Sequence, residues 1–377
     1  MSDKKFILVL LLAPLPFVLA LLGLLYIYDP FQVYHKPYFR ETTFFGDMRR
    51  QAKGIIKNYD FDSYILGTSM LENTYAKEAE EKLGGKWVNI SLAGSAFNER
   101  AVVLEYLFKT KEAKSIIYSL DITYLERMES TKKFDYLYDE NFLNDIKGYM
   151  NMKFFSCALV YSTREKCVGK DKNLEKLNFW ANNIEHNSQF GGFENWIKYS
   201  NDKQHLANAL KILANSKLEF QKSVEDISKI KENLENNLLR FVKENPQTEF
   251  SIIIPTYPRL FFYIKENKGY LDGDVAFYKY KQTMQWLIPH TKQFKNLKFY
   301  AFDTLLYADD IANYKDLTHY NKDLNSIFLS AIRDKTHILD SSNIGQYLKE
   351  MESKILEFDL SVFVKMAKEW ESKQSKP

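Results

Sequence analysis

Three residues that lie far apart in this sequence could together perform nucleophilic catalysis. Ser69 follows a short apolar segment and stands two residues after Gly67, whereas Asp316 and His319 lie three residues apart near the other end of the chain. A spacing of three can put two side chains on one face of a turn or helix start. A carboxylate there can fix the tautomer of an imidazole that takes the proton of a serine hydroxyl. The sequence therefore predicts a Ser69–His319–Asp316 triad.

Each half of this pattern also has a purely structural interpretation. Ser69 could cap a following helix, because serine is a favoured N-cap, and Asp316 with His319 could cap a loop. The order Ser, Asp, His, with each group just after a predicted strand, favours the catalytic interpretation. Asp121, at the end of another predicted strand, is expected to act as a structural cap rather than as a second acid.

The elements that must position these residues alternate between strand and helix. Strands are predicted at 64–66, 87–91, 115–121, 249–255 and 297–302, and helices at 48–57, 74–83, 97–109, 274–287 and 322–333. Such alternation predicts a parallel sheet with crossover helices. Sites in open parallel sheets form outside the carboxyl ends of the strands, which is where the three residues fall.

The alternation is interrupted by a long charged and aromatic stretch. We expect residues 61–123 and 247–345 to form the two parts of one α/β domain, and 124–246 to be a helical insertion or cap, with helices at 204–213 and 218–242. A stretch of this length is too long for a simple loop. Residues 346–377 are expected to be a C-terminal helix, at 347–371, and a polar tail.

Taken together, these segments resemble the SGNH (GDSL-like) hydrolase superfamily. Gly67-Thr68-Ser69 matches the serine block and Asp316-Leu317-Thr318-His319 the Asp-x-x-His block, while Gly94 fits the glycine of the second block. The resemblance covers roughly 60–125 and 247–340, and implies a three-layer α/β/α fold. It also implies an oxyanion hole built from the backbone N–H groups of Ser69 and Gly94. The third strand lacks the family's usual asparagine, for which Asn98 is the candidate substitute.

The absence of the family's usual asparagine after the third strand affects the expected activity. Losing one oxyanion donor typically costs about 100- to 1000-fold in rate. Membrane-anchored branches similar to the D-alanyl transfer protein and to alginate or peptidoglycan O-acetylation proteins share this departure. The resemblance therefore implies O-acyl transfer, most simply of acetyl, to a cell-surface glycan, beside a polytopic membrane acyltransferase as partner and acyl donor. An SGNH esterase or deacetylase, and a non-catalytic glycan-binding or assembly subunit, remain as alternatives.

The N-terminus supports attachment to a membrane. After a short tail at 1–5 with Lys4 and Lys5, residues 6–28 carry no charge, and about 20 apolar residues span a bilayer. The length of the run favours an uncleaved transmembrane anchor over a signal peptide. The lysines favour a cytoplasmic N-terminus, although Lys36, Arg40, Arg49 and Arg50 in the juxtamembrane segment 29–60 weaken that bias. We expect one span with the catalytic domain outside the cytoplasm, in the periplasm if the cell is Gram-negative.

Composition adds few constraints. The net charge of +3 is too small to indicate a nucleic-acid partner, and no metal site or cofactor is expected from the motifs. The two cysteines, Cys157 and Cys167, could pair in an exported protein or stay as separate thiols. The remaining histidines show no ligand spacing and are expected to be ordinary surface or core residues; they are His35, His186, His205, His290 and His337.

Overall fold

A mixed α/β domain carries the catalytic candidates in the computed structural model, which describes residues 3–177, 180–200, 202–215, 224–266 and 276–374. Its sheet has six strands in the order β2-β1-β3-β4-β5-β6. Strands β1 to β5 pair in parallel, and β6 pairs antiparallel with β5. Their bounds are Ser63–Leu66, Trp87–Asn89, Ser115–Ser119, Glu249–Ile254, Leu297–Ala301 and Ile338–Leu339. The five predicted strands are confirmed, whereas the two-residue β6 was not predicted.

Burial explains why these short apolar runs form a parallel sheet. Every residue of β1 and β2 is buried, and β3 is buried from its second residue. Strands covered on both faces read as continuous apolar runs, not as alternating ones. The strand order reverses direction at β1, which lies between β2 and β3. Loops that leave the carboxyl ends of β1 and β3 therefore flank a crevice of the kind that binds ligands in such sheets.

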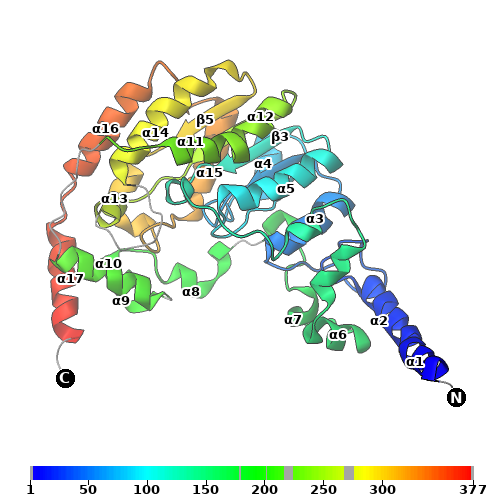
Figure 1. Cartoon of the computed structure of the whole chain (residues 1–377). Helices are drawn as coiled ribbons and strands as arrows, with labels where there is room; N and C mark the ends of the chain where they lie inside the picture. Colours follow the sequence, from blue (N-terminus) through cyan, green and yellow to red (C-terminus); the bar gives the residue numbers. More distant parts are fainter. Residues whose placement is uncertain (1–2, 178–179, 201, 216–223, 267–275, 375–377) are drawn as a thin grey trace.

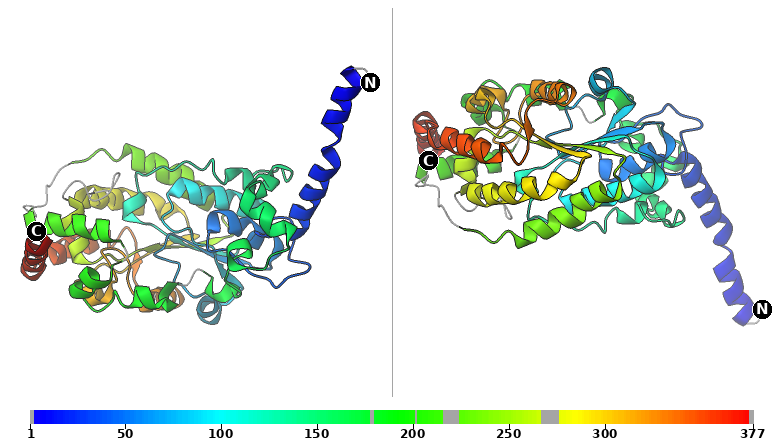
Figure 2. Two further views of the ribbon diagram at one scale, coloured as in Figure 1. Left: turned by 90° about the horizontal axis from the view of Figure 1, so that it is seen from below. Right: turned by 90° about the horizontal axis from the view of Figure 1, so that it is seen from above.

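Helices cover both faces of the sheet (Figure 2). On one face α4 packs against α15, and on the other α5 packs against α3 and α11. The helices of the α/β domain are α3 Met48–Asn58, α4 Ala76–Leu83, α5 Phe97–Thr110, α13 Arg259–Glu266, α14 Phe277–His290, α15 Lys322–Asp334 and α16 Ile344–Leu356. The predicted stop of α4 at the Gly84-Gly85 pair is confirmed, because both glycines adopt positive φ. Residues 274–275 of the predicted helix 274–287 lie outside the described residues.

Residues 124–246 divide into three parts in space (Figure 1). The first, with α6 Met152–Leu159 and α7 Glu165–Val168, lies beside the N-terminal helix. The second contains α8 Ile184–Asn187, α9 Phe193–Tyr199 and α10 Lys203–Asn215. The third, α11 Ser228–Leu234, the π-helical turn η6 Glu235–Leu239 and α12 Arg240–Glu244, packs on α5 as a crossover helix of the sheet. The predicted helix at 218–242 thus begins later among the described residues, and 218–223 lie outside them.

The C-terminal helical stretch is two helices, not the single one predicted. α16 ends at Leu356, and α17, Ser361–Gln374, packs against α10. The carboxylate of Asp359 accepts a hydrogen bond from the backbone N–H of Ser361, 2.8 Å away, and so caps the start of the second helix. Short 3₁₀ turns complete the chain: η1 Ile122–Tyr124, η2 Asp135–Leu137, η3 Asn144–Tyr149, η4 Leu174–Lys176, η5 Trp180–Asn182, η7 Thr291–Gln293, η8 Leu306–Asp309 and η9 Ile311–Asn313.

The N-terminal apolar run forms a helix that projects from the domain (Figures 1 and 2). It comprises α1, Asp3–Leu12, and α2, Leu15–Tyr28. Over Asp3–Tyr28 it is long and apolar enough, by length and composition, to cross a membrane. By length and composition alone, one such helix near an N-terminus is also compatible with a signal sequence.

Cys157 and Cys167 form a disulfide that joins α6 to α7. The sequence left pairing and separate thiols equally open, and the structure brings the two sulfur atoms together. The disulfide therefore cross-links the segment that packs against α2.

Candidate active site

The loop after β1 presents Ser69, and its conformation depends on Gly67. A Cβ atom at Gly67 would lie 2.8 Å from the side chains of both Leu71 and Ser119, so no larger residue fits without movement. The Gly67 N–H donates to the hydroxyl of Ser91 at 3.0 Å, and the Gly67 carbonyl accepts from Leu92 at 2.8 Å. These bonds tie the serine loop to the chain that leaves β2.

A buried polar network holds the same loop from the other side. The Asp121 carboxylate accepts hydrogen bonds from the hydroxyls of Thr68, at 2.7 Å, and Ser119, at 2.5 Å. Arg100 is fully buried, lies 3.7 Å from this carboxylate and donates to the Ser119 carbonyl at 2.7 Å. Asp121 thus connects the ends of β1 and β3. This matches its expected structural role, although it also lines the pocket described below.

Asp316 and His319 lie on a tight loop that the Asp316 carboxylate itself organises. One oxygen, Oδ1, accepts the backbone N–H groups of Thr318 and His319, each at 2.8 Å. The loop is closed by the bridge between Tyr314 and Tyr320. An aspartate that bonds its own backbone two and three residues further on stabilises such a turn without a helix. The imidazole of His319 is therefore presented at a fixed angle.

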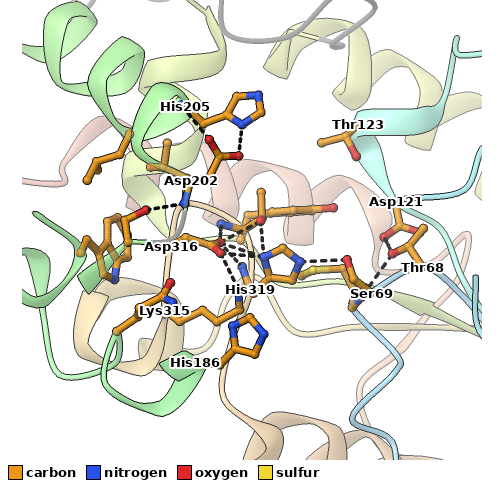
Figure 3. Close-up of a pocket in the computed structure, with 18 of the residues that line it drawn as sticks. Thr68, Ser69, Asp121, Thr123, His186, Asp202, His205, Lys315, Asp316 and His319 are labelled. Carbon is orange, nitrogen blue, oxygen red and sulfur yellow. Dashed lines mark hydrogen bonds and ion pairs between the residues drawn. The ribbon is translucent and has the colours of Figure 1, made fainter. Parts of the chain in front are cut away.

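The structure brings the three residues of the predicted triad together (Figure 3). Ser69 Oγ lies 2.8 Å from His319 Nε2, and His319 Nδ1 lies 2.9 and 2.8 Å from the two carboxylate oxygens of Asp316. Although Ser69 and His319 are 250 residues apart in sequence, they meet at the carboxyl edge of the sheet. The arrangement satisfies the geometric requirement for a serine that is deprotonated by a carboxylate-oriented imidazole.

Electrostatics keep the Asp316 carboxyl ionised. Burial acts to raise its pKa, but the charges of His319 and Lys315 and their hydrogen bonds outweigh burial, so the pKa lies well below its usual value. The Lys315 ammonium donates to Asp316 Oδ2 at 2.9 Å. An ionised Asp316 favours the proton on His319 Nδ1 and leaves Nε2 as the acceptor for the Ser69 hydroxyl.

Trp180 supports the triad from a segment that sequence reasoning did not single out. Its ring meets the His319 imidazole edge-on, with centroids 5.8 Å apart, and its Nε1–H donates to the Ser69 carbonyl at 3.4 Å. The Lys315 ammonium lies 5.1 Å from the centroid of the same ring. Trp180 therefore contacts two triad residues and the cation that pairs with the third. An isolated tryptophan in a charged stretch gives no sequence signal for this role.

A pocket of about 550 Å³ opens over Ser69 and His319, and the stretch 186–206 supplies one wall of it. It is lined by Thr68, Ser69, Met70, Asp121, Thr123, Tyr124, Arg127, His186, Gln189, Trp196, Ser200, Asp202, His205, Leu206, Tyr257, Lys315, Asp316, Leu317, Thr318 and His319. Aromatic rings and hydrogen-bonding groups thus share the lining. That combination suits a polar ligand with apolar faces, such as a sugar.

Two histidines that were expected to be ordinary line this pocket. Nδ1 of His205 bonds the carboxylate of Asp202, so a second carboxylate–imidazole pair faces the cavity (Figure 3). Burial lowers the pKa of His186, helped by the charges of Lys315 and His319. Nδ1 of His186 is buried and bonds no other group in the described part of the chain. His186 and His205 therefore both belong to the wall of the pocket.

The predicted oxyanion donors are only partly brought together. The backbone N–H groups of Ser69 and Gly94 bond no acceptor within the described residues, and Ser69 lines the pocket. Gly94, at a φ of 60°, is not among the residues that line the pocket, and a Cβ there would lie 3.5 Å from the hydroxyl of Tyr124, which does line it. Asn98 does not line the pocket. Its amide donates to the Glu129 carbonyl at 2.7 Å and accepts from the Glu129 N–H at 3.1 Å, so α5 directs it away from Ser69.

No group of three or more His, Cys, Asp or Glu side chains within the described ranges is placed to hold a metal ion.

The function of the site has to be inferred from its own geometry, because comparison with known proteins gave no match. A search of protein-family models and a search of curated proteins each found no match to this chain.

Glu72, in the serine loop, should make folding stability depend on pH. Burial raises the pKa of its carboxyl to about 7, against the opposing charges of Lys315 and Arg49. From about pH 4.3 to about pH 7 the unfolded chain loses this proton while the folded protein keeps it, so stability falls as pH rises. The loss of folding free energy above pH 7 is about 4 kcal/mol. We expect Glu72→Gln to remove this pH-dependent loss of stability. The variant should then be more stable than wild type at pH 8 and about equally stable at pH 4.

Urea unfolding of the full chain in detergent micelles, at pH 4 and pH 8, measures this effect. Glu81→Gln is the matched control, because Glu81 is exposed on α4. Equal pH dependence in wild type and Glu72→Gln would show that the Glu72 carboxyl ionises as freely in the folded protein as in the unfolded chain.

Proposed function

We propose that this protein is a membrane-anchored serine O-acyltransferase that passes an acyl group, in the simplest case acetyl, to a hydroxyl of a cell-envelope glycan. The observation that carries the proposal is the continuous hydrogen-bonded chain from Ser69 Oγ through His319 to Asp316. The parallel sheet with the serine loop at its reversal of strand order supports the SGNH-like three-layer fold that the sequence motifs suggest.

The reaction follows from the atoms of the triad. His319 Nε2 takes the proton of Ser69 as Oγ attacks the acyl carbonyl, and the backbone N–H of Ser69 helps to hold the oxyanion. The leaving group departs with the proton from Nε2, and an acyl-enzyme ester remains. A glycan hydroxyl then gives its proton to Nε2 and attacks this ester, and Nε2 returns the proton to Ser69 Oγ as the Oγ–acyl bond breaks and the acylated glycan leaves. Asp316 stabilises the imidazolium in both halves.

The wall opposite the triad supports a glycan as acceptor. Tyr124 is a half-buried ring of the pocket against which a sugar can pack, and Arg127 and the Asp202–His205 pair add polar groups. An esterase acting on small soluble esters would have less use for so large a polar wall. A subunit that only bound glycan would not need the Ser69–His319 hydrogen bond.

The cellular setting is part of the same proposal. The N-terminal helix serves as a single uncleaved span, with Lys4 and Lys5 in the cytoplasm and the catalytic domain outside. The Cys157–Cys167 disulfide supports an oxidising location. The acyl group reaches Ser69 from a polytopic membrane acyltransferase, the partner that the sequence resemblance implies.

Transfer, hydrolysis and binding are separated by supplying a chromogenic acetyl ester to the full chain in lipid nanodiscs, with and without an envelope oligosaccharide. We expect acetylated sugar to form faster than free acetate when the oligosaccharide is present. Acetate at an unchanged rate, with no acetylated sugar, would mean an esterase. Oligosaccharide binding with neither product, for every small ester supplied, would leave the non-catalytic subunit.

A further inference from the structure

The membrane-crossing helix enters the domain without a spacer. Leu25 and Tyr28 of α2 are fully buried, and Leu24 packs against the same core. Directly after the helix, the buried Asp29 carboxylate accepts the backbone N–H groups of Val33 and Tyr34 at 2.9 and 2.8 Å. The Tyr28 hydroxyl also donates to the Ser162 carbonyl at 2.6 Å. The end of the helix is therefore fixed to the domain.

Helix length then sets how far the domain lies from the bilayer. Residues 3–24 span roughly 33 Å at about 1.5 Å per residue, and the hydrocarbon core is about 30 Å thick. With Lys4 and Lys5 in one headgroup layer, Leu24 reaches the opposite boundary. The surface of the domain around Leu25 must therefore lie at the level of the headgroups.

That surface is apolar and exposed. Phe39, Met152 and Val160 are 76%, 76% and 75% exposed, and Tyr38 and Leu159 are also more exposed than covered. On α6, Phe154, Cys157 and Ala158 face the core while Met152 and Leu159 face solvent. α6 packs against α2 and lies on the side of the domain from which the N-terminal helix projects (Figures 1 and 2).

We propose that Tyr38, Phe39, Met152, Leu159 and Val160 form a membrane collar that is buried in the interfacial layer of the lipid bilayer around the base of α2. Lipid is the occupant because the helix length places these side chains at the depth where aromatic and apolar groups favour the boundary. The disulfide holds α6 in this position. The collar would fix the rotation and tilt of the domain, and with them the direction of the Ser69 pocket. This inference rests on the proposed transmembrane anchor.

Depth-dependent fluorescence quenching tests the collar in the full chain. Because both native cysteines are paired, a third cysteine can carry an environment-sensitive dye. The collar variants are Phe39→Cys and Met152→Cys. Phe17→Cys reports the interior of the span, and Val362→Cys on α17 reports the end of the domain far from α1 (Figure 1). Each labelled protein is reconstituted, without any other protein, in vesicles with spin-labelled lipids that quench either near the headgroups or deep in the chains.

We expect the shallow quencher to reduce emission at Phe39 and Met152 at least about twofold more than at Val362, and the deep quencher to act most strongly at Phe17. Quenching at Phe17 with none at Phe39 and Met152 would overturn the collar while keeping the anchor, and would reassign this surface to a protein partner. Lack of quenching at Phe17 would instead refute the anchor. A third collar position, Val160→Cys, guards against a label at Met152 that disturbs α6.

Discussion

Replacing Ser69 with alanine is expected to lower acyl transfer by at least about 1000-fold. The hydroxyl is the only group bonded to His319 Nε2 within the described residues, so its loss removes both the nucleophile and the proton that the imidazole accepts. Removing the nucleophile of a triad leaves only the catalysis supplied by binding and by the oxyanion donors. Initial rates with the chromogenic ester measure the loss.

The mass of the intact protein tests the same prediction independently of turnover. Wild type quenched during the reaction should carry one acyl group on Ser69, and Ser69→Ala should carry none. Ser200→Ala is the matched comparison, because it alters another serine of the same pocket. That variant must still form the acyl-enzyme, whatever it does to acceptor affinity. An acyl group found on Ser200, or undiminished acylation of Ser69→Ala, would contradict the assigned nucleophile.

The framework of the site could be predicted because its signals are local. The run at 64–66 is apolar throughout, the run at 115–119 has an apolar centre at 116–118, and both are buried there, as expected for strands covered on both faces. Gly67 and Asp316 also act locally, through a close approach and through bonds to the next few backbone N–H groups. These features alone placed Ser69, Asp316 and His319 at strand ends.

The rest of the site depends on contacts between distant segments, which spacing does not encode. Trp180 reaches the triad from a segment 111 residues after Ser69. Asn98 was a reasonable oxyanion donor by position, but the Glu129 backbone satisfies its amide. The stretch 124–246 appeared to be one helical block, because helical periodicity does not show which surface each helix covers. In the structure, its parts lie on α2, over the pocket and on the sheet.

Asp316→Asn should separate the two roles of the Asp316 carboxylate, which are to hold the shape of its loop and to orient the His319 imidazole. The asparagine oxygen can still accept the backbone N–H groups of Thr318 and His319 that Oδ1 accepts now, so the loop should keep its shape. In place of Oδ2, however, an amide nitrogen would face two donors, Lys315 Nζ and His319 Nδ1. The remaining oxygen lies 2.9 Å from His319 Nδ1 but already accepts three other hydrogen bonds. The imidazole therefore relieves the conflict by moving its proton to Nε2, where it can no longer accept from Ser69. The expected loss in rate is about 1000- to 10,000-fold.

Single-turnover acylation of Ser69, followed by intact mass, measures this effect without interference from the acceptor. Asp202→Asn makes the same change in the other carboxylate–imidazole pair of the pocket, and this variant must still acylate Ser69. Thermal unfolding of both variants checks that the loop and the pocket remain folded. If Asp202→Asn abolished acylation while Asp316→Asn preserved it, the roles of the two pairs would have to be exchanged. The stabilising charge would then come from Asp202, directly before α10, and not from the loop after β5.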